Sequence, residues 1–219
     1  MKLNRTDIAC ALVVAGQLAA ALYVAQRGAT GPIPMHFDLH GVPNRWGDRA
    51  EAARLLAGLG VGTGLIYAML RNSPTTANRP GTTQSGATMV IAVGALIAAL
   101  ATAMGLGLLT HVAARASGWF LMSLLSLLML GSGVFLGKVA PNPWIGVRTW
   151  GTVNSRLAWD KANRLAGRIY FWAGLAGLLA SPFAPQPLGL QAVLAAAVGG
   201  AALAMFESWR VWRSEAAPR

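Results

Sequence analysis

Long apolar runs are the feature of this chain that most limits its fold. A helix needs roughly 20 apolar residues to cross a bilayer core about 30 Å thick. Only 11% of the 219 residues are charged, whereas soluble domains usually carry about 25%. The sequence therefore predicts an all-α integral membrane protein, a single membrane domain over residues 1–219 with a bundle of about six transmembrane helices. Six segments approach or reach the required length: Ile8–Ala25, Ala52–Leu70, Ala87–Ala114, Gly118–Val139, Ile169–Ala184 and Leu188–Phe206.

Basic residues determine the predicted orientation. The net charge is +11, with 18 Lys and Arg against seven Asp and Glu. Membrane proteins retain Lys and Arg on the cytoplasmic side. With a cytoplasmic N-terminus, thirteen basic residues fall inside and five outside. We therefore predict a multi-pass protein of the inner (cytoplasmic) membrane with both termini cytoplasmic. Its positive charge favours anionic lipid headgroups of the bilayer, and we expect no nucleic-acid partner.

The orientation makes residues 26–51 an extracytoplasmic polar loop. Its prolines prevent a regular helix, and its glycines allow turns. His36, Asp38 and His40 alternate, and in an extended segment such residues point to one face. Two imidazoles and a carboxylate suit a divalent metal such as zinc. The sequence shows no evident fourth ligand, so the alternative is a plain polar loop that folds onto the helix bundle.

Residues 138–168 form the predicted cytoplasmic polar loop. Asn142, Pro143 and Gly146 suit an irregular turn that places Arg148 near the end of the bundle. A helix is expected from Thr152 onward. One interpretation is a surface helix that lies on anionic lipid. The other is a docking surface for a protein or peptide. In both, a cationic stripe at helical spacing faces outward: Lys161, Arg164 and Arg168.

Few polar residues occur inside the apolar runs. They are Gln17, His111 and Glu207, and an ionisable group in a membrane is a functional candidate by default. A small transporter or channel would line its path with such groups, but their scarcity argues against it. No Ser-His-Asp set, HExxH motif, phosphate loop or acid pair is present, so the chain is not expected to be an enzyme. The remaining enzymatic alternative is a metal-dependent membrane enzyme that uses the His36, Asp38 and His40 loop.

Two motifs together resemble the SdpI family of bacterial membrane proteins. The first contains Pro34, His36 and Phe37, followed by Gly41 and a turn at residues 44–47. The second reads NPWIGVRT from Asn142, with Trp159, Arg164 and Gly167 downstream. With the helices between them, the resemblance covers most of the chain. The family usually has a histidine directly before the arginine at 164, whereas this chain has Asn163, so the role of that histidine does not carry over.

The resemblance implies immunity to a secreted, membrane-active antimicrobial peptide toxin. It also implies signalling, in which a repressor is held at the membrane when the toxin is present. His36, Phe37 and Asp38 would bind or sense the peptide. Arg148 is the strongest single candidate, because a guanidinium can donate to several backbone carbonyls at a loop–helix junction. The cytoplasmic loop would hold the active conformation or recruit a transcriptional regulator through Asn142, Gly146, Arg148, Thr149, Trp159 and Arg164. Apart from the metal alternative, no cofactor is expected.

Overall fold

The computed structural model describes residues 3–72, 80–108 and 117–216. These residues form seven helices and one two-stranded sheet, which confirms the predicted all-α membrane protein and adds a hairpin to it. The elements, in chain order, are α1 (Arg5–Arg27), β1 (Ile33–Phe37), β2 (Pro43–Gly47), α2 (Arg49–Arg71), α4 (Pro80–Gly105), α6 (Ser117–Leu136), α7 (Trp150–Asn154), α8 (Arg156–Ala180) and α9 (Leu188–Ala216).

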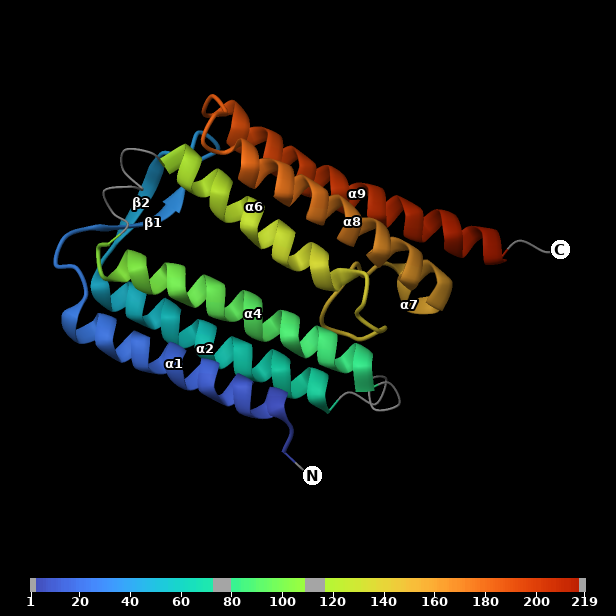
Figure 1. The fold of residues 1–219 in the computed structure, drawn as a ribbon, viewed down its shortest axis with the longest axis horizontal. Coiled ribbons are helices and arrows are strands. Elements are labelled where there is room, and N and C mark those ends of the chain that lie inside the picture. Colours follow the sequence, from blue (N-terminus) through green and yellow to red (C-terminus); the bar gives the residue numbers. More distant parts are fainter. Residues whose placement is uncertain (1–2, 73–79, 109–116, 217–219) are drawn as a thin grey trace.

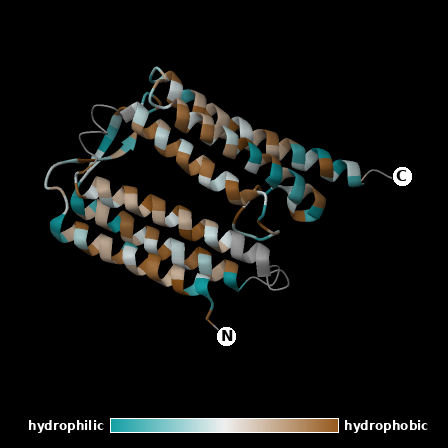
Figure 2. Cartoon of the chain, in the orientation of Figure 1, coloured by the Kyte–Doolittle hydropathy of each residue, from teal (hydrophilic) through white to brown (hydrophobic). Residues whose placement is uncertain are grey.

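The long helices form two adjacent layers, α1–α2–α4 and α6–α8–α9, which meet where α4 contacts α6 (Figure 1). The hairpin lies at one end of both layers, called the hairpin end below. The start of α1, the short helix α7 and the end of α9 lie at the other, called the basic end (Figure 1). Hydrophobic residues follow the helix lengths, and hydrophilic residues gather toward the two ends (Figure 2). This distribution is what a bilayer around the bundle requires.

Five described helices are long and apolar enough to cross a membrane, with mean hydropathies between 1.5 and 2.2. The fifth predicted span, Ile169–Ala184, differs from the helix that forms. Helix α8 begins already at Arg156 and ends at Ala180, so its first half is charged and only its second half is apolar. It nevertheless packs against both α6 and α9. A cap, rather than hydropathy, determines where α8 starts, because the Ser155 side chain accepts a hydrogen bond from the Ala158 amide.

The hairpin is anchored to the first layer by its apolar base. Ile33 is buried in one cluster with Val24 of α1 and Leu56 of α2. Arg45 of β2 and Glu51 of α2 form an ion pair that joins the other strand to the same layer. The predicted span Ala87–Ala114 forms helix only to Gly105 in the described residues, and its remainder, with His111, lies largely outside them.

Glycines let the helices of the second layer approach closely. A Cβ atom added to Gly133 of α6 would collide with the backbone of Phe171, and one added to Gly174 of α8 would collide with the backbone of Leu130. In lipid, where apolar side chains gain little from leaving the solvent, such close backbone contact is a main source of helix association. The close α6–α8 pair therefore supports the loop that connects these two helices.

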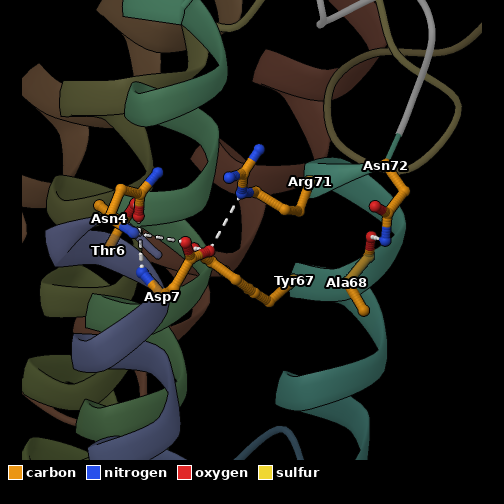
Figure 3. Close-up of polar contacts among 7 residues, drawn as sticks. All are labelled: Asn4, Thr6, Asp7, Tyr67, Ala68, Arg71 and Asn72. Atoms are coloured by element: carbon orange, nitrogen blue, oxygen red, sulfur yellow. Dashed lines mark hydrogen bonds and ion pairs between the residues drawn. The ribbon is translucent and has the colours of Figure 1, made fainter. Parts of the chain in front are cut away.

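A polar cluster joins α1 to α2 at the basic end (Figure 3). Asp7 Oδ1 accepts hydrogen bonds from the Tyr67 hydroxyl at 2.7 Å and from Arg71 Nε at 3.0 Å. Its Oδ2 accepts one from the Asn4 amide at 2.8 Å, which completes the capping box of α1. One carboxylate thus caps one helix and holds the last turn of the next.

We expect Asp7→Ala to lower the thermal midpoint of the detergent-solubilised protein, because the Tyr67 hydroxyl and the Arg71 guanidinium lose their shared acceptor. The matched control is Asp160→Ala, since the Asp160 side chain has no hydrogen bond or ion pair within the described chain. Tryptophan fluorescence during heating measures both. Equal midpoints for the two variants would show that the cluster does not stabilise the α1–α2 pair.

Candidate functional site

The extracytoplasmic loop of the prediction folds into an antiparallel hairpin. His36 pairs with Arg45, and Phe37 pairs with Pro43. The strand ends at Phe37, because Asp38 then turns the chain: its Oδ1 accepts hydrogen bonds from the backbone amides of His40 (2.8 Å) and Val42 (2.9 Å). This arrangement is an Asx turn, a local side-chain contact that competes with continued strand pairing.

The turn breaks the predicted face of three metal ligands. The i, i+2, i+4 alternation holds only while the backbone is extended, and it stops before His40. His36 Nδ1 lies 2.6 Å from Asn44 Oδ1 across the hairpin, whereas His40 Nδ1 lies 3.6 Å from Asp38 Oδ2. Within residues 3–72, 80–108 and 117–216, no three His, Cys, Asp or Glu side chains are arranged to hold a metal ion. The predicted three-ligand face of His36, Asp38 and His40 is therefore not formed.

A hollow of about 380 Å³ lies between the hairpin and the second helix layer. Its outer rim contains the three hairpin residues that the resemblance singled out, His36, Phe37 and Asp38. Met35 and Leu39 complete the hairpin side. The helix side is made of leucines alone: Leu121, Leu124, Leu125 and Leu128 of α6, with Leu190 and Leu194 of α9. The hollow thus combines an apolar wall with a polar rim.

The Asp38 carboxylate gives this rim a negative charge. The hydrogen bond from the Val42 amide holds the pKa of Asp38 below its usual value, and the His40 amide and ring act in the same direction. These contacts outweigh the opposite effect of partial burial. Asp38 is ionised at neutral pH, as an ordinary aspartate is, and its lowered pKa keeps it ionised further into acid. A ligand in the hollow therefore meets leucine side chains on one side and a carboxylate on the other.

At the basic end, Asn142 organises the loop that leads out of α6. Its side chain is buried and makes four hydrogen bonds, all to the backbone of its own loop. Nδ2 donates to the carbonyls of Ala140 and Ile145, both at 2.9 Å. Oδ1 accepts from the amides of Trp144 and Ile145, both at 2.8 Å. Every donor and acceptor of this amide is used, so Asn142 determines the shape of the turn.

Two residues of α8 hold this loop through hydrogen bonds to its backbone. Trp159, 2% exposed, donates from its indole nitrogen to the Val139 carbonyl at 2.9 Å. Asn163, 1% exposed, accepts from the Val147 amide at 2.8 Å and donates to the Trp159 carbonyl at 3.0 Å. Gly146 packs against the side chains of Trp159 and Asn163, and its φ is +120°. We call Asn142, Gly146, Trp159 and Asn163 the loop clamp.

The loop clamp continues into α7 and onto α9. Thr149 caps α7 through a reciprocal contact with Thr152, and its hydroxyl also hydrogen-bonds to that of Ser208 on α9. A Cβ atom on Gly151 would lie 2.6 Å from Ser208 Oγ, so α7 rests directly on α9. The motif from Asn142 to Thr149 is thus a folded connector between α6, α8 and α9.

A comparison with known protein families gives a match over this region. Residues 138–207 match the SdpI/YfhL protein family. The match covers about a third of the chain, contains the whole loop clamp, and confirms the resemblance to this family. Comparisons with curated proteins and with solved structures gave no match. The SdpI family is not known as an enzyme family.

The SdpI-like loop brings together most, but not all, of its predicted residues. Asn142, Gly146, Thr149 and Trp159 lie in one connected network. Arg148 is exposed and makes one long contact, from Nη1 to the Asn142 carbonyl at 3.4 Å, where several carbonyl contacts were expected. Arg164 is outside the network, on the exposed face of α8.

Asn163 and Ser208 are the functional candidates that sequence reasoning missed. In the sequence, Asn163 stands out only as a departure from the histidine that the resemblance implies, yet its side chain joins the loop to α8. A signal was available: Asn163 lies one helical turn after Trp159, so both occupy the same face of α8. Ser208 carried no such signal, because its partner Thr149 is far away in the sequence.

The polar residues that a transport path would need do not lie along one path in the described structure. Gln17 is buried within the first layer and donates from Nε2 to Thr63 Oγ1 at 3.3 Å and to the Gly94 carbonyl at 3.0 Å. Glu207 lies at the basic end of the second layer, paired with Arg210 through two contacts of 2.8 Å. His111 lies outside the described residues. The described geometry therefore gives no support to the transporter or channel alternative.

Proposed function

We propose that this SdpI-like membrane protein gives immunity to, or signals the presence of, a secreted membrane-active antimicrobial peptide. The observation that carries the proposal is the leucine-lined hollow under the hairpin. In the proposed topology, the hairpin faces the outside of the inner membrane, and both termini and the loop clamp face the cytoplasm. The excess of Lys and Arg in the loops of the basic end supports this orientation.

The hollow has the chemistry that an amphipathic peptide needs. Membrane-active peptides usually present one apolar face and carry Lys or Arg on the other. The leucines of α6 and α9 would receive the apolar face, and the ionised Asp38 would attract a cationic group at the rim. Capture at this point would remove the peptide from the outer surface of the membrane. The proposal uses no cofactor, and metal analysis of the purified protein tests that part of it.

Helix α9 offers a physical link to the cytoplasm. Leu190 and Leu194 line the hollow near its start, and Ser208 supports Thr149 and α7 near its end. Beside that contact, the apolar side chains of Trp150, Val153 and Leu157 are exposed. A peptide that shifted α9 would move this surface, which is where we place the docking of a cytoplasmic regulator. A shared helix gives a physical route for coupling, and only a functional experiment measures the coupling itself.

The direct test removes the hairpin side of the hollow. We expect the double variant Phe37→Ala with Leu39→Ala to reduce protection about thirtyfold, because two apolar contacts of about 1 kcal/mol each are lost. The measurement is the lowest inhibitory concentration for a sensitive bacterium that produces the protein, challenged with a panel of membrane-active bacterial peptides.

The matched control is Val42→Ala, which removes an exposed apolar side chain of the same hairpin that does not line the hollow. Membrane levels of all variants are equalised by immunoblot. Protection by the double variant equal to that of the wild type would place the peptide elsewhere. A wild type that protects against none of the peptides would remove support for immunity.

A further inference from the structure

A second hollow, of about 280 Å³, lies on the outer side of the α6–α8 pair near the basic end. Its floor is the close contact between these helices, where Gly133 and Gly137 of α6 face Gly167 of α8. It faces away from the first layer. Ala166, whose cluster packs against Met89 of α4, lies two residues from Arg164 and Arg168 and therefore on the opposite side of α8.

Three cations border this hollow. Lys138 follows the end of α6, and Arg164 and Arg168 lie one turn apart on α8. Within the described chain, no carboxylate lies within ion-pair distance of any of the three. Arg164 and Arg168 also border a neighbouring hollow that contains Glu207, but that carboxylate is already held by two contacts from Arg210. The hollow therefore has a strong positive charge with no internal counter-ion.

The other walls of the hollow are apolar. Val134, Phe171 and Trp172 line it on the side toward the hairpin end, and Trp172 is 63% exposed. Gly137, beside Arg164, comes directly after the last residue of α6. The cations thus lie at the end of an apolar span, at headgroup depth, and the aromatic side chains lie one to two turns deeper, at acyl-chain depth.

We infer that this hollow binds a single anionic phospholipid. Its phosphate lies between Lys138, Arg164 and Arg168, and an acyl chain follows the groove past Val134 and Trp172. Arg side chains bind phosphate with paired N–H donors, and Trp packs well at the membrane interface. The order of cationic and apolar walls along the groove matches the order of headgroup and chain in a lipid. A free anion would leave the apolar half unused.

The test is native mass spectrometry of the full-length protein in detergent, titrated with phosphatidylglycerol or with phosphatidylcholine of the same acyl chains. We expect the wild type to bind phosphatidylglycerol at least tenfold more tightly. The variant Arg164→Gln with Arg168→Gln should lose most of that preference, since each basic residue contributes about fivefold to anionic lipid binding. The control, Arg5→Gln with Arg156→Gln, removes equal charge from the same end outside the hollow and should keep the preference.

Two further arms separate a lipid from a free anion. Trp172→Ala should weaken phosphatidylglycerol binding several-fold without removing any charge, and excess inorganic phosphate should not displace the lipid. Displacement by phosphate would assign the hollow to a free anion and overturn the inference. Equal binding of the two lipids by the wild type, or an equal loss in the control variant, would also overturn it. None of these outcomes bears on peptide immunity, which uses the hollow at the hairpin end.

Discussion

Gly146→Ala is expected to lower the free energy of unfolding by about 3 kcal/mol, because the residue combines a forbidden backbone angle with a crowded position. Its φ of +120° belongs to a region that is essentially restricted to glycine. The added Cβ atom would lie 2.7 Å from Asn163 Oδ1 and 3.0 Å from the Trp159 ring. Both neighbours are fully buried parts of the loop clamp and cannot move aside without breaking their own hydrogen bonds.

Thermal or denaturant unfolding in detergent, followed by tryptophan fluorescence, measures this loss. Gly131→Ala is the control, because nothing lies within 4 Å of its Cβ position in α6 and alanine favours a helix more than glycine does. If Gly146→Ala were as stable as the Gly131→Ala protein, the loop would tolerate a side chain at this point. The clamp would then not depend on glycine.

Asn163→Leu is expected to cost about 2–3 kcal/mol of unfolding free energy. Leucine is similar in size, but it cannot accept a hydrogen bond, so the Val147 amide loses its partner in a partly buried position. The substitution should also release the loop from α8, since the Asn163 side chain joins the two. Increased proteolysis between α6 and α8 is the second expected result, and limited digestion of the solubilised protein measures it.

Asn163→His tests whether this position needs a hydrogen-bond acceptor. The Nδ1 atom of histidine occupies the place of Oδ1 in asparagine, and in the neutral ring it can accept the same amide hydrogen. We therefore expect Asn163→His to keep most of the stability that Asn163→Leu loses. This result would also explain how Asn163 can take the place of the histidine that the SdpI resemblance implies at this position. A histidine variant as unstable as the leucine variant would show that the acceptor is not what the clamp needs.

The membrane class of this protein follows from local composition. Apolar runs such as Ala52–Leu70 can satisfy their backbone polar groups in lipid only as helices, so hydropathy alone identifies the five apolar helices. The prolines and glycines of residues 31–49 excluded a regular helix across that segment, and the hairpin confirms this expectation. The SdpI resemblance could also be recognised from local sequence, because the Asn142–Thr149 motif is a contiguous turn whose hydrogen bonds are mostly local.

Other features depend on contacts that no local pattern contains. The boundaries of α8 depend on the Ser155 cap, and the alternation of His36, Asp38 and His40 ends where an Asx turn competes with the strand. Sequence reasoning favoured Arg148 because its residue type can make many contacts, but the buried hydrogen bonds are made by Asn142, Trp159 and Asn163.

The sequence by itself determined that this chain is a helical membrane protein, which loops are polar, and which family its connector resembles, because each depends on residue types within a short window. Only the tertiary structure decided which side chains meet. The leucines of α6 and α9 form a hollow only when the hairpin covers them, and Ser208 contacts Thr149 only when α7 rests on α9. Contacts between distant segments depend on helix packing, whose geometry is determined by the whole bundle rather than by either segment.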